Sequence, residues 1–99
     1  MKVVATPDAI EFVRTHGGHV FVWTEPMRYA YGFNVFVLEA STESPGVTRE
    51  FLRFEGGEIN LLFDPGEHDT PDEIHLALVG RLRKQVRAYW NGKSFGSDA

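Results

Sequence analysis

The change of hydrophobic period at Gly17-Gly18 is the sequence feature that most limits how this chain can fold. Before the pair, Thr6-Pro7-Asp8 has the composition of a helix start: a hydroxyl N-cap, a proline at the first helical position and an acid near the positive end of the helix dipole. Ile10 and Val13 follow at helical spacing, and the glycine pair supplies a left-handed stop. Beyond it, the apolar pattern has a period of two, which predicts one short helix followed by β-strands.

Short segments rich in β-branched and aromatic residues fill most of the remaining sequence. The segments predicted to form strands are Lys2–Ala5, His19–Trp23, Phe33–Glu39, Glu50–Phe54, Ile59–Phe63, Glu73–Val79 and Arg81–Trp90. His19–Trp23 is apolar on nearly both faces, which predicts a central strand covered on both sides, and Glu25-Pro26 is expected to end it. Glu55-Gly56-Gly57-Glu58 predicts a hairpin between two of the strands. We therefore expect a mainly β domain of the α+β class, with one N-terminal helix packed on the side of a mixed sheet or small sandwich.

The segment Arg81–Trp90 admits two interpretations. A basic helix is one of them, but its β-branched and aromatic residues favour a strand. On a strand, Arg81, Arg83 and Arg87 would share one face beside Tyr89. A basic strip next to an aromatic ring could contact nucleic acid, whereas a solvated face or a guarded sheet edge needs no ligand. The acidic balance of the whole chain favours the second interpretation.

The length of the chain fits one domain and leaves no room for two, because it has 99 residues. We assign residues 1–95 to a single domain and residues 96–99 to a flexible tail. The 42% hydrophobic content supplies a core and argues against disorder. A domain of this size buries only about two thirds of its unfolded surface, so we expect modest stability.

The residue content excludes several classes of function. No cysteine is present, so the chain's own residues cannot form a disulfide, a thiolate nucleophile or a thiolate metal site. The net charge of -4 disfavours general attraction to nucleic acid. No apolar run reaches the roughly 20 residues needed to span a bilayer, and the first residues lack the apolar core of a signal peptide. We therefore expect a cytoplasmic protein with no membrane partner.

The order of the segments and several short motifs resemble one known family. Val3–Gly18 corresponds to an opening strand, a Thr-led helix and a Gly turn, and Ala30-Tyr31-Gly32-Phe33 corresponds to a turn of the type Cys-Ser-Gly-Phe. Leu61–Pro65 matches a strand that ends in Asp-Pro. Glu73–Gly80 and Ala88–Asn91 match a later strand with its glycine turn and a final strand with an aromatic-Asn pair. Over nearly its whole length, the chain resembles the HesB/A-type (IscA-like) iron–sulfur cluster carrier family.

This resemblance implies a HesB-like mixed β-sandwich, but it does not carry over the chemistry of the family. The first cluster ligand of the family falls on Ala30, and its C-terminal Cys-Gly-Cys pair falls in or near Asn91–Gly96. Neither alanine nor the lysine in that segment can replace a thiolate toward iron. The resemblance thus implies a degenerate member that lacks the cluster-ligand cysteines and holds no cofactor.

Aromatic side chains gather in sequence around the turn where the first cluster ligand would lie. The residues assigned to this candidate binding pocket or interface are Trp23, Met27, Tyr29, Ala30, Tyr31, Phe33, Tyr89 and Trp90. Aromatic residues dominate interface hot spots and line apolar pockets, which favours a binding role. The alternative is that they fill the core, because a small domain needs large side chains to build one.

The loop between two predicted strands is a weaker candidate for a metal site. Asp64, Glu67, His68 and Asp69 offer carboxylate oxygens and one imidazole. These residues lack the fixed ligand rhythm of known calcium loops, and acids with prolines also make ordinary turns.

The histidines are a second source of metal ligands. His16 and His19 flank the glycine pair, and His75 lies on a predicted strand. A zinc site would need a third ligand from elsewhere, and His16 suits a helix C-terminus, where positive charge is favourable. No Gly-x-Ser-x-Gly elbow, phosphate-binding glycine loop or His-Glu-x-x-His motif is present, so we expect no enzymatic activity.

The function we expect is a non-catalytic binding or interaction module on an iron–sulfur-carrier-like fold that has lost thiolate cluster binding. Its partner is expected to be an unidentified protein, with a homodimer as one arrangement. A metal-binding protein that uses His and carboxylate ligands is the alternative. Weak nucleic-acid binding through the basic strand Arg81–Arg87 is a second alternative.

Overall fold

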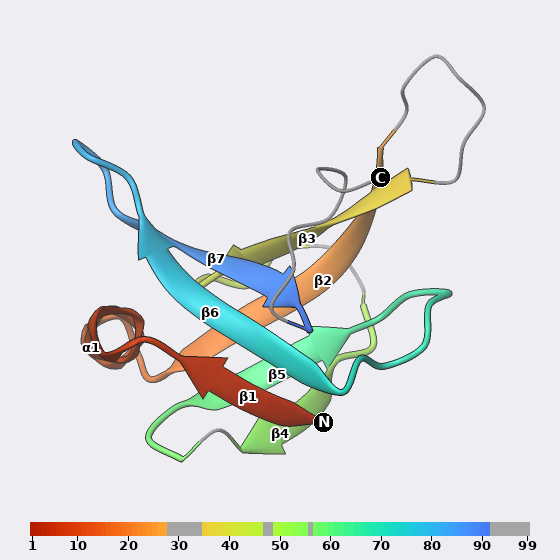
Figure 1. Ribbon diagram of the computed structural model, residues 1–99, viewed down its shortest axis with the longest axis horizontal. Helices are drawn as coiled ribbons and strands as arrows, with labels where there is room; N and C mark the ends of the chain where they lie inside the picture. The colour runs from red at the N-terminus through yellow and green to blue at the C-terminus, as the bar shows by residue number, and fades with distance from the viewer. Residues whose placement is uncertain (28–34, 47–48, 56, 92–99) are drawn as a thin grey trace.

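The computed structural model describes residues 1–27, 35–46, 49–55 and 57–91 of the chain. Within these residues the elements are β1 (Lys2–Ala5), α1 (Pro7–Thr15), β2 (His19–Met27), β3 (Val35–Ser41), β4 (Leu52–Glu55), β5 (Asn60–Asp64), β6 (Glu73–Val79) and β7 (Gln85–Trp90) (Figure 1). Strands dominate and one short helix follows the first of them, which confirms the predicted α+β class.

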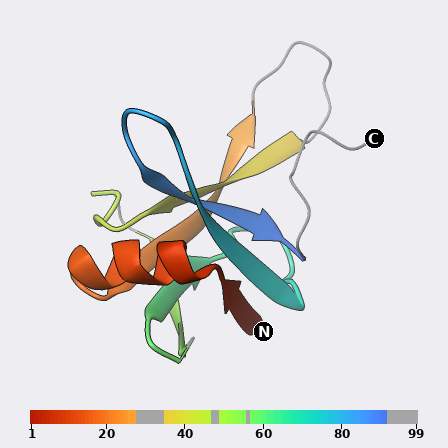
Figure 2. The same cartoon turned by 60° about the vertical axis from the view of Figure 1, so that its left-hand side comes forward.

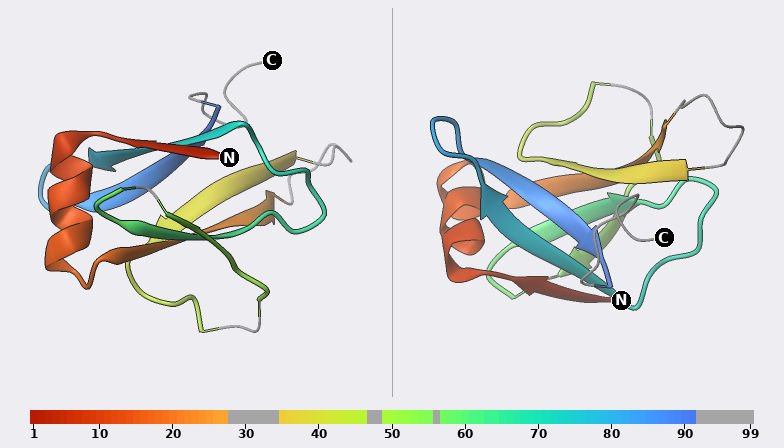
Figure 3. Two further views of the ribbon diagram at one scale, coloured as in Figure 1. Left: turned by 90° about the horizontal axis from the view of Figure 1, so that it is seen from below. Right: turned by 45° about the horizontal axis from the view of Figure 1, so that its top comes forward.

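The strands form two mixed sheets that face each other as two layers (Figure 3). The strand order is β1-β6-β7 in the smaller sheet and β3-β2-β5-β4 in the larger. Each sheet contains one parallel pair, β1 with β6 and β2 with β5, and its other pairs are antiparallel. The helix lies at one end of the layers (Figures 2 and 3) and contacts strands of both sheets.

The hydrophobic core lies between the sheets and is built by alternate residues of the strands together with one face of the helix. Its buried members are Ala9, Val13, Val20, Val22, Ile59, Leu61, Phe63, Ile74, Leu76, Val86 and Ala88. The strands therefore have an inner apolar face and an outer face of mixed character, as the two-residue period predicts.

The helix begins and ends where the sequence predicts. The Thr6 side chain accepts a hydrogen bond from the backbone N–H of Ala9, and Pro7 opens the helix. At the other end, His16 is the C-cap, and its Nδ1 lies 2.7 Å from the carbonyl oxygen of Phe12. The predicted position of His16 at the helix C-terminus is confirmed.

The prediction that Glu25-Pro26 ends the second strand is wrong, because β2 continues to Met27. The parallel neighbour β5 pairs with β2 only as far as Trp23, whereas β3 pairs with it up to Met27. Pro26 therefore lies where β2 has one neighbour, and a missing N–H is tolerated at such an edge.

The last predicted strand is also too long. Strand β7 begins at Gln85, and Gly80–Lys84 form the turn that joins it to β6. Arg81 and Arg83 consequently lie in this turn and do not share a strand face with Arg87. Alternation of charged and other residues continued through the turn, so the sequence pattern did not mark where the strand starts.

Candidate functional site

Four rings meet at the end of the sandwich opposite the helix. His68, in the loop between β5 and β6, stacks on Phe36 of β3 with their ring centroids 3.6 Å apart. Trp90, at the end of β7, meets Phe36 edge-on at 5.8 Å and Phe63 at 6.1 Å. Phe63 is fully buried, whereas the other three are half-buried. We call these four residues the aromatic end cluster.

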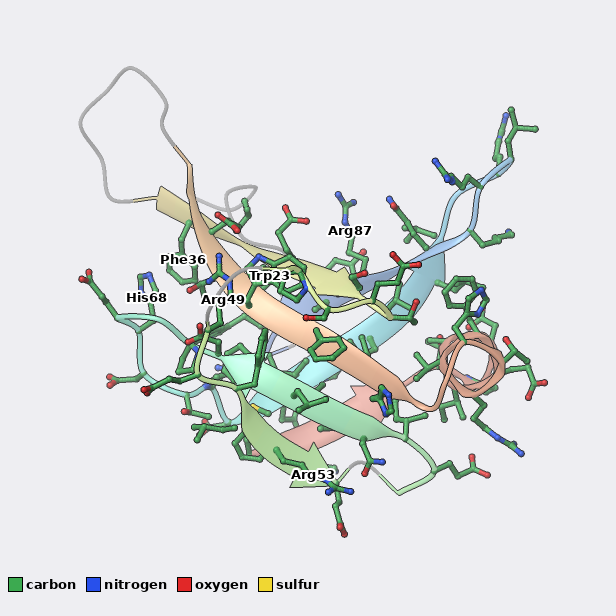
Figure 4. All side chains as sticks on the ribbon, turned by 180° about the vertical axis from the view of Figure 1, so that it is seen from behind. Trp23, Phe36, Arg49, Arg53, His68 and Arg87 are labelled. Carbon is green, nitrogen blue, oxygen red and sulfur yellow. The ribbon has the colours of Figure 1, made fainter. Side chains whose placement is uncertain are left out.

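The aromatic end cluster is fixed by elements that are distant in sequence. Phe63 anchors it in the core, and the start of the loop that carries His68 is held to β2 because Thr24 Oγ1 donates a hydrogen bond to the carbonyl oxygen of Pro65. Figure 4 shows Phe36 and His68 side by side at the edge of the fold. Half-buried, rigid rings of this kind offer large apolar area with little loss of conformational entropy on binding.

A second group of side chains lies on the outer face of the larger sheet. Glu25 Oε1 accepts hydrogen bonds from Trp23 Nε1 and from an Arg49 terminal nitrogen, both at 2.8 Å. The other terminal nitrogen of Arg49 lies 3.6 Å from Asp64 Oδ2, and its guanidinium lies 5.7 Å from the Trp23 ring centroid. Figure 4 shows Trp23 and Arg49 close together.

We call these four residues, Trp23, Glu25, Arg49 and Asp64, the Arg49 network. Only 20% of the surface of the Arg49 side chain is exposed. Its Nε atom is buried without a hydrogen-bond partner among the described residues. The guanidinium is paired with two carboxylates, Glu25 and Asp64, so the network holds the segment that carries Arg49 against the sheet.

The outer face of the smaller sheet forms a third surface. Val4, His75, Ala77 and Tyr89 line a shallow, mainly apolar depression of about 300 Å³. His75 Nε2 lies 2.9 Å from Glu73 Oε1. The hydrogen bond from His75 lowers the pKa of the Glu73 carboxyl below its ordinary value.

The structure places the described residues of the predicted aromatic pocket in three different surroundings. Trp23 belongs to the Arg49 network, Tyr89 faces outward from β7, and Trp90 belongs to the aromatic end cluster. Successive residues of a strand point to opposite faces, which separates Tyr89 from Trp90. The remaining members, the Met27 side chain with Tyr29, Ala30, Tyr31 and Phe33, lie outside the described residues.

The acidic loop does not gather its ligands into one site. Asp64 accepts a hydrogen bond from the backbone N–H of Gly66 and pairs with Arg49, while His68 stacks on Phe36. In the described part of the chain, no group of three or more His, Cys, Asp or Glu side chains is placed to hold a metal ion, and Glu67 and Asp69 join none.

His16 and His19, which flank the glycine pair, contact different residues. His16 stacks on Phe12 with centroids 4.0 Å apart, and His19 meets Phe21 edge-on. Each imidazole thus has a local structural contact, which is the more ordinary role of such residues.

Sequence reasoning missed three important residues. The sequence pattern marks Phe36 only as part of a strand, and Glu25 only as the end of one, although both make central contacts. Arg49 directly precedes the predicted strand Glu50–Phe54, and arginine at the end of a strand is usually solvated. Its nearness to Trp23 depends on the path of the chain after β3, which no local pattern records.

Comparison with protein-family models, with curated proteins and with solved structures finds no match. Within the described residues, the fold is mainly β, with two sheets and one helix at their end. In the described part of the chain, no helix is long and apolar enough to cross a bilayer.

Proposed function

We propose that this chain is a non-catalytic binding module that contacts a protein partner through the aromatic end cluster. The observation that carries this proposal is the stack of His68 on Phe36 beside Trp90, which brings together half-buried rings from a loop and two strands. Clustered aromatic side chains that are fixed in place and partly exposed are typical of interface hot spots.

The resemblance to HesB/A-type carriers supports a binding role without cluster chemistry. Its segment order agrees with a mixed two-sheet architecture with an early helix. Alanine occupies the position of the first cluster ligand of that family, at Ala30, and no cysteine occurs anywhere in the chain. We propose that the fold of the carriers is retained here for recognition, with no cofactor bound.

Selection from a random peptide library against the whole chain tests the proposal. We expect enriched peptides to bind the wild type and to lose at least tenfold in affinity with His68→Ala, because the stacked ring would be removed from the contact surface. His75→Ala is the matched control, since it removes a partly exposed imidazole from the outer face of the other sheet. Peptides that bind both variants equally well would show that the contact surface lies elsewhere.

The metal-binding alternative is tested separately with iron, zinc and manganese salts. We expect no saturable heat of binding, and no cluster absorbance after reconstitution with iron and sulfide, because the described ligand types are dispersed and thiolates are absent. Stoichiometric metal binding by the wild type that is lost in His68→Ala would instead show that the loop between β5 and β6 supplies a metal ligand. The metal-binding function would then replace the protein-binding proposal.

Nucleic-acid binding is a second alternative that one observation favours. Arg81, Arg83 and Lys84 are exposed in the turn between β6 and β7, next to the fully exposed Leu82. A compact basic turn could contact phosphates with little sequence preference. A salt-dependent shift of single-stranded DNA that Arg83→Ala reduces would support this function, and no shift at low salt would remove it.

A further inference from the structure

The outer face of the smaller sheet has an ordered arrangement that the proposed function does not use. Cα pairing defines three rows across it. Lys2, Glu73 and Asn91 form the first row, Val4, His75 and Tyr89 the central row, and Ala77 and Arg87 the third. The central row contains the apolar floor of the shallow depression.

Two of the charges on this face, Glu73 and Arg87, lie on opposite sides of the central row, and a third, Lys2, lies beside Glu73 in the first row. Glu73, on β6, lies in the first row, and Arg87, on β7, lies in the third row. Arg87 is exposed, and no carboxylate of the described residues lies within ion-pair distance of it. Glu73 keeps 40% of its side-chain surface exposed despite its hydrogen bond to His75.

We propose that a second copy of this chain packs on this face, with a two-fold axis along the central row. The axis lies in the plane between the two facing sheets and exchanges the first and third rows. Each Glu73 then faces Arg87 of the other copy, which creates two symmetric ion pairs. Val4, His75 and Tyr89 each approach their own counterpart near the axis, so the apolar centre is buried between the pairs.

A second copy fits this surface better than an unrelated protein because the face is complementary to itself. A two-fold interface requires that whenever one residue contacts another, the reverse contact also forms, and the Glu73 and Arg87 positions satisfy this condition. They lie on adjacent strands, about 4.8 Å apart sideways. The arginine side chain is long enough to span that offset.

The size of the face predicts a weak dimer. Three strands about 4.8 Å apart and about five residues long, at about 3.3 Å each, cover roughly 14 by 17 Å. That footprint is well below the about 800 Å² per partner of a standard interface. We therefore expect a dimer that forms only at high protein concentration.

Sedimentation velocity of the full chain from about 10 µM to 1 mM tests the dimer through a charge exchange. Arg87→Glu and Glu73→Arg should each weaken association at least tenfold, because like charges then face each other twice. The double variant Glu73→Arg with Arg87→Glu restores both pairs in the opposite sense and should dimerise like the wild type. Because recovery in the double variant requires both positions, a loss caused by misfolding is distinguishable.

Arg53→Glu is the control, since it changes the net charge by the same amount as Arg87→Glu but lies on the larger sheet (Figure 4). It should leave the association unchanged. A wild type that stays monomeric at 1 mM would overturn the proposal, as would a double variant no better than the single ones. Peptide binding through the aromatic end cluster would be unaffected by either result, so the two proposals fail independently.

Discussion

Arg49 helps to hold the segment after β3 to the outer face of the larger sheet, together with Phe51, whose ring meets Phe21 of β2 edge-on. Its guanidinium bonds Glu25, approaches Asp64 and lies over Trp23, so one side chain uses both its charge and its flat face. Arginine suits this position because the N–H groups of its guanidinium can bond two carboxylates while its flat face lies over an indole ring.

Replacing Arg49 with alanine should lower the free energy of unfolding by about 1–3 kcal/mol, because Glu25 and the more deeply buried Asp64 would lose a shared cation. Urea denaturation measures the loss, and the emission of Trp23 should change with it. Arg53→Ala, which removes only an exposed bond to Asn60, should stay within about 0.5 kcal/mol of the wild type. Equal effects of the two substitutions would contradict the assigned role.

A hydrogen bond from the Thr6 hydroxyl lowers the pKa of Asp8 below its ordinary value of 3.8. The folded state therefore holds the proton less tightly than the unfolded state, so the carboxylate stabilises the fold above that ordinary pKa. This contribution disappears as the pH falls through the lower, folded pKa.

Thr6→Ala should raise the pKa of Asp8 toward 3.8 and cost about 1 kcal/mol of stability through loss of the N-cap. Carbon-detected NMR titration of the Asp8 carboxyl follows the first effect, and urea denaturation the second. Thr15→Ala removes a hydroxyl that bonds the carbonyl oxygen of Phe12 at the far end of the helix, so it should leave the Asp8 titration unchanged.

At the scale of elements, the turn between β6 and β7 depends on Gly80. Its φ of 108° is left-handed, and a Cβ there would clash with the carbonyl oxygen of Arg83. Gly57, in the other hairpin, is also left-handed with φ 81°, but a Cβ there would meet nothing within 4 Å. Substitutions at the two glycines therefore distinguish the cost of a strained backbone, which both share, from the cost of a steric clash, which only Gly80 has.

Gly57→Ala should cost only about 1 kcal/mol, the strain of the left-handed backbone. Gly80→Ala should cost more and should also shift the amide resonances of β6 and β7, because the turn must open to admit the methyl group. Thermal unfolding and two-dimensional NMR compare them. A larger loss from the Gly57 substitution would contradict this account of the Gly80 turn.

The elements that sequence could predict are those whose signals are local. Thr6 and the Gly17-Gly18 pair mark the helix, and the glycines after Glu55 mark the hairpin of β4 and β5, since caps and turns act within a few residues. The continuation of β2 through Pro26 was missed because it depends on where β5 stops pairing with β2. The site was harder still: Phe36 and His68 meet across distant segments, so neither residue's neighbours in sequence indicate the stack.

At the scale of the whole molecule, one core joins both sheets, and Phe63 is the largest of its members with no exposed surface. It also contacts Trp90, so it connects the core to the aromatic end cluster. A substitution of Phe63 should therefore affect both the stability of the fold and the aromatic end cluster.

Phe63→Ala should reduce the free energy of unfolding by about 3–5 kcal/mol, a large share of the 5–15 kcal/mol typical of a small domain. Urea denaturation measures the loss. Leu82→Ala truncates an apolar side chain that is 104% exposed, so it should change stability by less than about 0.5 kcal/mol. A loss below about 1 kcal/mol for Phe63→Ala would show that the cavity refills or that the core is loosely packed.

The parallel pairing of β1 with β6 has a consequence for how the molecule is made. Lys2 pairs with Glu73, about 70 residues later in the chain, so the first strand leaves the ribosome long before its neighbour exists. The smaller sheet cannot close during synthesis of the first half, and the larger sheet with its own long-range β2–β5 pair must wait for β5. We therefore expect folding dominated by distant contacts, in milliseconds to seconds, with β1 docking among the last events.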